Sequence, residues 1–240
     1  MSLISRPDAI SSPNAVATSG GDGTVPVGNA PAADAIHQIA SIASPVTAGS
    51  RNRVTAEHPS TDERRDSADE LWDAQTGNYA DAAAWGEVIV LAVKGSGAEA
   101  TLEQAGIANL ADKLVIDATN PIADAKPDNG VIRYFTNANE SLMERLQAKA
   151  PQAKFVKAFN SVGNKFMVNP PHQPTPTMFI CGNDAGAKAE ATKFLTQFGW
   201  ETAGMGMVES ARPIEMLCQL WCAPGMLRGE WTNAFKLLKL

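Results

Sequence analysis

The chain has 240 residues, of which 44% are hydrophobic and 19% are charged, and its net charge is −6. These values are ordinary for a globular protein, and an acidic chain lacks the basic face that a general nucleic-acid binder needs. No apolar stretch reaches the roughly 18 residues that span a bilayer, and the N-terminus lacks the apolar core of a secretory signal. We therefore expect no nucleic-acid partner and no membrane partner.

Residues 1–78 differ in composition from the rest of the chain. They are rich in Ser, Pro, Ala, Asp and Arg and poor in aromatic and branched apolar residues. Between Ile4 and Ser19 only Ala15–Ala17 resembles a strand. A glycine-rich turn at Gly20–Gly28 then precedes an Ala-rich segment, Ala32–Ala43, that suits a helix.

This glycine-rich turn is a candidate pyrophosphate site, because glycines before a helix let the backbone approach phosphate. Gly23 and Gly28 occupy the first and last glycine positions of the dinucleotide fingerprint, whereas Val25 stands at the middle one. A plain flexible loop explains the turn equally well.

A second candidate follows in Val46–Asn52, about 20 residues after Gly28, where the second strand of a dinucleotide-binding fold should end. Ser50 and Arg51 offer a hydroxyl and a guanidinium group, both suited to the 2′-phosphate of NADP. The alternative is an ordinary surface turn with a basic residue.

From Tyr79 onward, strands and helices alternate, which predicts an α/β fold with a doubly wound, mostly parallel sheet. The expected strands are Val88–Val93, Leu114–Asp117, Phe155–Phe159, Thr177–Cys181 and Trp200–Ala203. The expected helices are Ala80–Trp85, Ala98–Leu110 capped by Ser96, one capped by Asn139, one capped by Asp184, and Val208–Leu240 broken near Pro213 and at Pro224–Gly225. We expect a dinucleotide-binding domain over residues 1–205, of which 1–78 are atypical, and a small C-terminal helical segment over residues 206–240.

Three of these strands run into polar turns, Lys94–Ser96, Ala118–Pro121 and Asn160–Gly163, which predicts one ligand-binding crevice at the carboxyl ends of the strands. The carboxamides of Asn120 and Asn160 could orient a nicotinamide or a planar acceptor, or could merely satisfy turn backbone.

The charged residues near these turns do not include an evident catalytic base. Asp117 is expected to cap local amides instead of acting as one, and Lys157 sits inside a strand and can point away from the site. No Ser/His/Asp or Cys/His set is evident, so no catalytic residue is assigned and the chemistry would rest on positioning a cofactor.

The three cysteines predict no disulfide framework and indicate a reducing, cytoplasmic compartment. Cys218 and Cys222, four residues apart on an expected helix, suit either two buried thiols or half of a metal site. Three histidines follow no metal-binding spacing, so we expect no metal: His37, His58 and His172.

These motifs resemble a known family, the NADPH-dependent reductases of the deazaflavin coenzyme F-420, whose domain also occurs in predicted dinucleotide-binding enzymes. The matching segments are Val46–Asn52, Val88–Gly95, Val115–Pro121, Phe155–Val162, Pro176–Asp184 and Glu209–Arg212. The resemblance is good from about Tyr79 to Leu238 and patchy over residues 1–78. One account of residues 1–78 is a degraded site, and another is a shifted reading frame upstream of Tyr79.

The resemblance implies a Rossmann domain, often paired as a homodimer, that passes a hydride from NADP(H) directly to an acceptor. Carried over by position, the residues at the pyrophosphate would be Gly23, Thr24, Val27 and Gly28, and those at the 2′-phosphate would be Ser50 and Arg51. Along the cofactor would lie Ala92, Val93 and Lys94, with Asn120 and Pro121 near the nicotinamide. The acceptor would be bordered by Ala158, Phe159 and Asn160.

We therefore expect an NADPH-dependent oxidoreductase with a small-molecule acceptor. The acceptor would be coenzyme F-420 or another flavin, and a quinone or a metal chelate are the alternatives. The alternative is a non-catalytic NADP-binding sensor or scaffold with an eroded phosphate-binding loop.

Overall fold

The computed structural model describes residues 2–5, 39–43 and 74–238, with side chains from residue 77 onward. It contains, in chain order, β1 (Ser2–Ser5), β2 (Ile39–Ala43), β3 (Ala74–Thr76), α2 (Tyr79–Trp85), β4 (Val88–Ala92), α3 (Ala98–Ala105), β5 (Leu114–Asp117), α4 (Leu142–Lys149), β6 (Lys154–Lys157), β7 (Thr177–Ile180), α5 (Ala185–Gln197), β8 (Glu201–Gly204) and α6 (Ala211–Arg228). The helix predicted for Ala32–Ala43 is wrong over its last five residues, because Ile39–Ala43 pairs with β4 as a strand.

Parallel strands form the centre of a six-stranded sheet with the order β3-β1-β2-β4-β5-β6. β2, β4, β5 and β6 are parallel, and β1 pairs antiparallel with both β2 and β3. The register places Leu91 opposite Asp117 and Asp117 opposite Lys157, so the carboxyl ends of β4, β5 and β6 lie level at one edge. The mostly parallel sheet predicted from the apolar runs is confirmed.

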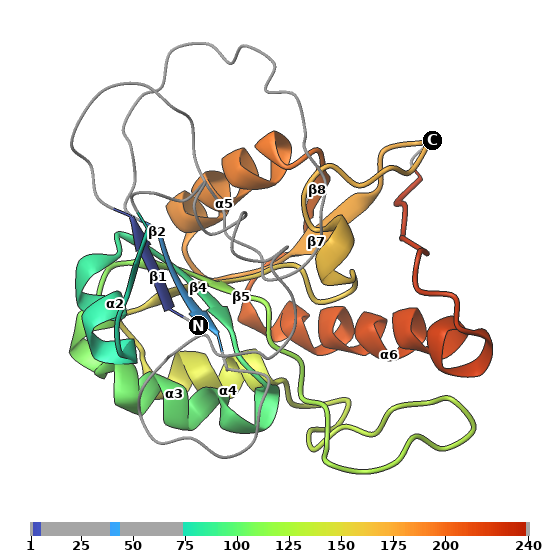
Figure 1. Ribbon diagram of the computed structural model, residues 1–240, viewed down its shortest axis with the longest axis horizontal. Coiled ribbons are helices and arrows are strands. Elements are labelled where there is room, and N and C mark those ends of the chain that lie inside the picture. The colour runs from blue at the N-terminus through green and yellow to red at the C-terminus, as the bar shows by residue number, and fades with distance from the viewer. Residues whose placement is uncertain (1, 6–38, 44–73, 239–240) are drawn as a thin grey trace, which may run out of the picture.

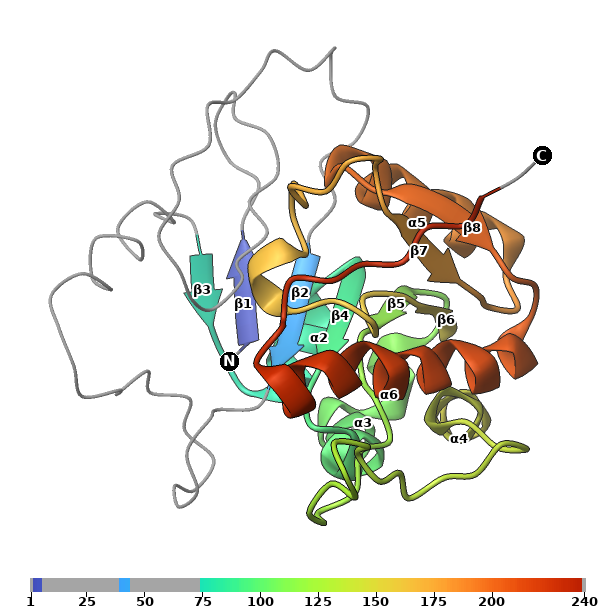
Figure 2. The same cartoon turned by 90° about the vertical axis from the view of Figure 1, so that its right-hand side faces the viewer.

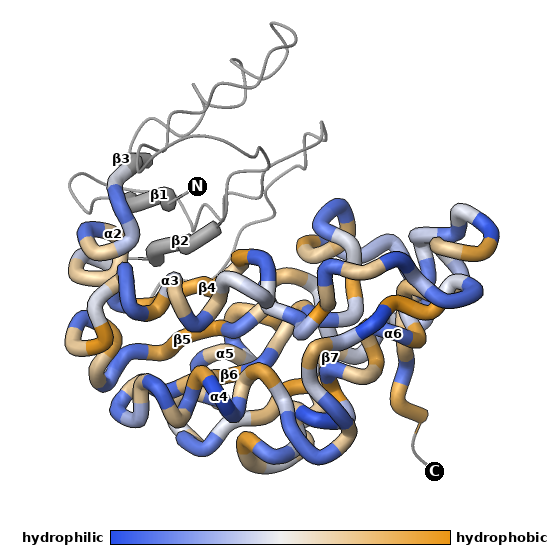
Figure 3. The backbone as a smooth tube through the Cα atoms, turned by 90° about the horizontal axis from the view of Figure 1, so that it is seen from below, coloured by the Kyte–Doolittle hydropathy of each residue, from blue (hydrophilic) through white to orange (hydrophobic). Residues whose placement is uncertain are grey.

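Helices cover both faces of this sheet (Figure 1), with α2, α3 and α4 on one face and α5 on the other. Alternate residues of each strand point to opposite faces. Ile89, Val115 and Phe155 therefore pack under α2–α4, whereas Leu114 and Val156 pack under α5. Figure 3 shows the hydrophobic colouring that runs along β4 and β5.

Helix caps differ from the predicted ones at two of three positions. Asp184 caps α5 as predicted, and its carboxylate accepts a hydrogen bond from the backbone of Ala187. α4 is capped by Ser141 and not by Asn139, because Ser141 forms a reciprocal capping box with Glu144. α3 begins after Gly97, and Ser96 lies in a short 3-10 turn before it.

α6 is a continuous helix of 18 residues in which the predicted breaks do not occur. The helix predicted for Val208–Leu240 is wrong over residues 229–238, which are not helical. Pro213 is its third residue, where a backbone N–H would have no partner within the helix. Pro224 lies near the C-terminal end, and the helix ends at Gly229 with a left-handed φ of 73°. Within the described ranges, none of the helices is long and apolar enough to cross a membrane.

β7 and β8 form a separate two-stranded parallel sheet, joined to β6 by a bridge between Lys157 and Cys181. The chain beyond α6 returns toward β7 (Figure 2), where Thr177 donates its backbone N–H to Phe235 at 2.9 Å. The C-terminal segment therefore connects the end of α6 to the second sheet.

Candidate functional site

The turns after β4 and β5 are in direct contact at the carboxyl edge of the sheet. A Cβ atom built on Gly95 would lie 1.9 Å from the carbonyl oxygen of Asn120. Any side chain at residue 95 would therefore push the two turns apart. The contact requires a glycine, and it brings together two of the three polar turns that the sequence predicted to share a crevice.

The two carboxamides at this edge form a short chain of hydrogen bonds. The amide nitrogen of Asn120 donates to the backbone oxygen of Asn160 at 3.1 Å, and the amide nitrogen of Asn160 donates to the backbone oxygen of Ile214 on α6. The side-chain oxygen of Asn120 is buried and has no hydrogen-bond partner in the described part of the chain. A buried acceptor without a donor is costly, so a ligand that displaced the atoms covering this oxygen and supplied a donor would be stabilised.

Phe159 turns the chain where β6 ends. Its φ is +61°, in the left-handed region that residues with a bulky side chain rarely adopt. Its backbone N–H donates to the sulfur of Met178 at 3.1 Å, and its ring lies 6.2 Å from that of Phe198. These contacts hold a strained residue in place beside Asn160, a pattern that recurs at ligand sites.

A cluster of three buried charges lies beneath the edge. The ammonium of Lys157 is 2.9 Å from a carboxylate oxygen of Asp117 and 2.9 Å from one of Glu215, and the three side chains are at most 1% exposed. Burial alone would lower the pKa of Lys157, but the two carboxylates outweigh burial and raise that pKa. Lys157 is therefore a cation at neutral pH.

Two predictions about this cluster can be compared with the structure. Asp117 caps local amides as predicted, because it accepts the backbone N–H of Thr119 at 2.9 Å and its hydroxyl at 2.6 Å. Lys157 points into the protein beneath the site. Glu215 was not predicted, although a lone acidic residue within the apolar run from Ile214 to Cys218 was a visible signal.

The other predicted site residues have three different placements. Lys94 and Ala92 are exposed, and Lys94 pairs with Asp124 in the loop after β5. Val93, Pro121 and Ala158 are buried, so their side chains do not line the surface of the edge. Six cofactor residues lie outside the described residues: Gly23, Thr24, Val27, Gly28, Ser50 and Arg51.

The cysteines are free thiols in the interior. Cys218 and Cys222 are both buried, with their sulfur atoms 3.9 Å apart, and Cys181, which directly follows β7, is buried as well. Burial raises the pKa of Cys181 to about 12, so this thiol is protonated at neutral pH. Among the residues that the structure describes, no three His, Cys, Asp or Glu side chains are grouped so that they could hold a metal ion.

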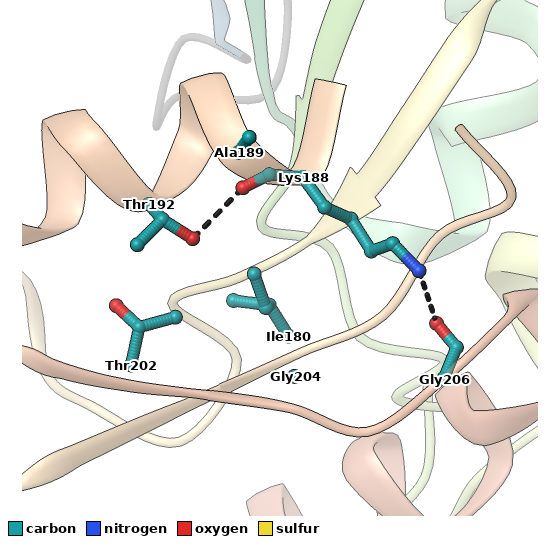
Figure 4. A pocket seen from close by; sticks show the side chains of 7 residues that line it. All are labelled: Ile180, Lys188, Ala189, Thr192, Thr202, Gly204 and Gly206. Carbon is teal, nitrogen blue, oxygen red and sulfur yellow. Dashed lines mark hydrogen bonds between the residues drawn. The ribbon is translucent and has the colours of Figure 1, made fainter. Parts of the chain in front are cut away.

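Two surface hollows lie apart from these turns. One, of about 400 Å³, lies between α5 and β7–β8 (Figure 4), where Lys188 donates to the carbonyl oxygen of Gly206 at 3.0 Å. The other, of about 440 Å³, is lined by Leu114 and Lys154 at the amino ends of β5 and β6. Neither is lined by Lys94, Asn120 or Asn160, so the two hollows and the predicted cofactor edge are separate places.

A family model described as NADP oxidoreductase, coenzyme F-420-dependent, matches residues 35–121. The match begins within the segment where the resemblance was judged patchy. It includes Ser50 and Arg51, and it starts after the glycine turn Gly23–Gly28. No curated protein matches the chain.

Solved structures give further matches. A protein of Arthrobacter sp. FB24, provisionally named an F-420-dependent NADP reductase, is 32% identical with a TM-score of 0.63, over 67% of this chain and 73% of that chain. A hypothetical protein of Sinorhizobium meliloti is 21% identical with a TM-score of 0.47, over 67% of this chain and 70% of that chain. An imine reductase variant from Myxococcus stipitatus in complex with NAD⁺ is 18% identical with a TM-score of 0.48, over 70% of this chain and 52% of that chain.

The identity to the Arthrobacter protein and the span of that match carry the assignment, and the fold agrees with it. The chain belongs to the coenzyme F-420-dependent NADP oxidoreductase family.

Proposed function

We propose that this protein is an NADPH-dependent oxidoreductase that transfers a hydride between NADP(H) and a flavin-like or deazaflavin acceptor. The observation that carries the proposal is the unpartnered carboxamide oxygen of Asn120 at the carboxyl edge of a parallel sheet. Family membership supports NADP(H) as the cofactor.

We place the nicotinamide ring of the cofactor at this edge. Its carboxamide would donate to the side-chain oxygen of Asn120, which is already oriented because its amide nitrogen donates to Asn160. Bound NADPH would supply the hydride. Asn120 and Asn160 would fix the plane of the ring, and the buried side chains of Val93 and Phe159 would exclude water below it. Holding two flat rings in contact supplies much of the rate by proximity.

The phosphates of the cofactor would be bound by residues outside the described part of the chain. We assign the 2′-phosphate to Ser50 and Arg51, which lie within the matched residues 35–121. We assign the pyrophosphate to Gly23, Thr24, Val27 and Gly28. β2 ends at Ala43, level with Ala92 of β4, so Ser50 and Arg51 follow a strand whose carboxyl end is at the cofactor edge.

The acceptor would lie over the turn after β6, which is formed by Ala158, Phe159 and Asn160, whose side chains are buried. We further propose a homodimer, supported by exposed apolar side chains of Leu220 and Leu227 on α6, which are 60% and 57% exposed. A cytoplasmic location fits the three free thiols. Sedimentation of the purified protein would give its mass and test the dimer directly.

The test is a fluorescence titration of the purified protein with NADPH and, in parallel, with NADH. Tight binding of NADPH alone supports the cofactor assignment, and binding of neither would refute it. Stopped-flow oxidation of bound NADPH by coenzyme F-420 and by FMN then separates the enzyme from an NADP-binding sensor. If bound NADPH is oxidised by neither acceptor, the sensor is the better description.

A further inference from the structure

The three buried charged side chains beneath the carboxyl edge of the sheet are not explained by a gain in stability. Transfer of a charged group from water into the protein interior costs several kcal/mol, and a buried ion pair often returns no more than its own desolvation penalty. Lys157, Asp117 and Glu215 are all at most 1% exposed. An apolar cluster of the same volume would fill this space at lower cost.

Each of the three charged side chains also forms a hydrogen bond with a backbone group. The two carboxylate oxygens of Glu215 accept the backbone N–H groups of Leu142 and Met143 at 2.9 Å and 3.1 Å, at the start of α4. The positive end of the α4 dipole therefore faces this carboxylate and offsets part of the excess negative charge. The cluster joins α4, α6 and the carboxyl ends of β5 and β6.

The residue that the cluster restrains most is Thr119. Its carbonyl oxygen accepts from the Lys157 ammonium at 2.6 Å, and its backbone N–H and hydroxyl both donate to Asp117. Three hydrogen bonds thus fix the residue that immediately precedes Asn120. Asn160 is held to the backbone of Ile214, the neighbour of Glu215 in α6, so both carboxamides depend on the same buried framework.

We propose that Lys157 is a positioning residue: through the carbonyl of Thr119 it holds the carboxamide of Asn120 in the orientation that binds the nicotinamide end of NADP(H). This inference rests on the proposed function. It assigns to the cluster a role at one end of the cofactor, and it therefore predicts an effect that a general loss of stability would not produce.

The experiment compares two ligands on the full-length protein. One is NADPH, and the other is 2′-phosphoadenosine 5′-diphosphoribose, which carries the adenine and phosphates but no nicotinamide. The variant Lys157→Met keeps an unbranched side chain that is one atom shorter and removes the charged ammonium. We expect it to bind NADPH about tenfold more weakly, the effect of one lost hydrogen-bonded contact, while binding of the fragment changes less than about twofold.

A matched control is Lys113→Met. The Lys113 ammonium also donates to two backbone oxygens, those of Ala83 at 2.7 Å and Ala84 at 3.1 Å, but at the amino end of β5. This variant should lose stability without any selective loss of NADPH binding.

Thr119→Val provides a second test of the proposal if Lys157→Met does not fold. It removes only the hydroxyl that donates to Asp117 and preserves the shape of the side chain. We expect the same selective pattern with a smaller amplitude, together with a lower kcat and a similar KM for the acceptor. Equal weakening of both ligands, or no change in either, in the folded variants would overturn the positioning role. If the wild-type protein binds neither ligand, the cofactor assignment fails instead.

Discussion

At the scale of single residues, Asn120 is the position on which the cofactor assignment depends. Its nitrogen is used within the protein and its oxygen is not. We expect Asn120→Ala to weaken NADPH binding by about 1 kcal/mol, the net value of one hydrogen bond, and to slow oxidation of the bound cofactor. Titration and single-turnover oxidation measure the two effects.

The control for this substitution is Asn139→Ala, since Asn139 is an exposed asparagine in the loop before α4. It should leave both quantities unchanged. Unaltered binding and rate in Asn120→Ala would show that the free oxygen does not contact the cofactor.

Arg51 gives the second prediction at this scale. Arg51→Ala should weaken NADPH binding by roughly 1.5–3 kcal/mol, the range for a hydrogen bond to a charged group, and should leave NADH binding nearly unchanged. Parallel titrations with the two cofactors provide the measurement. An equal loss for both would contradict the assignment of the 2′-phosphate to this guanidinium.

At the scale of elements, the start of α4 depends on one serine. Ser141 is buried and accepts the backbone N–H of Glu144, while Glu144 accepts the backbone N–H of Ser141 at 2.8 Å. We expect Ser141→Ala to lower the free energy of unfolding by about 1 kcal/mol. Urea unfolding of the two proteins would show it.

Ser96→Ala is the matched control, because Ser96 was predicted as a cap and forms no capping bond in the structure. Its unfolding midpoint should stay within error of the wild type. A loss at Ser96 as large as the loss at Ser141 would mean that the caps are misassigned.

The helices and strands show where sequence reasoning succeeds. The strands β4, β5 and β6 were predicted because a strand buried on both faces is apolar at nearly every position. Such a run is visible in the sequence without knowledge of the neighbouring strands. The meeting of Asn120 and Asn160 was predicted because the carboxyl ends of parallel strands lie at one edge of the sheet. The cap of α4 was missed, since Asn139 and Ser141 both suit a cap and only the packed helix shows which one is used.

Glu215 illustrates what local patterns do not contain. It lies 58 positions after Lys157 in sequence, and the contact between them exists only because α6 crosses the carboxyl edge of the sheet. The continuity of α6 at Pro213 was missed for a related reason. A proline in the first turn of a helix costs little, but a pattern that treats every proline as a break cannot distinguish that position.

At the scale of the whole molecule, the attachment of α6 to α4 makes stability depend on pH. The guanidinium of Arg212 donates to the carboxylate of Glu144 and lowers the pKa of Glu144 below its usual 4.5. A carboxyl group with a lowered pKa contributes fully above its unfolded pKa, and this contribution is lost as the pH falls through the folded pKa. We expect the free energy of unfolding of the wild type to decline below about pH 4.5 more steeply than that of Glu144→Gln.

The control for this series is Glu103→Gln, which removes a carboxylate whose side chain is 61% exposed and paired with Lys149. Its unfolding free energy should follow the wild-type curve, because exposed pairs contribute little. Parallel curves for the wild type and Glu144→Gln would mean that this pair does not couple acid titration to unfolding.

The contact between Gly95 and Asn120 limits how the carboxyl edge of the sheet could be re-engineered. A library that varies residue 95 alone would return glycine, because any larger residue collides with the neighbouring turn at 1.9 Å. Insertions in either turn would displace the other. Positions 95 and 120 would therefore have to be varied together. Substitutions in the turn after β6 do not meet this restriction.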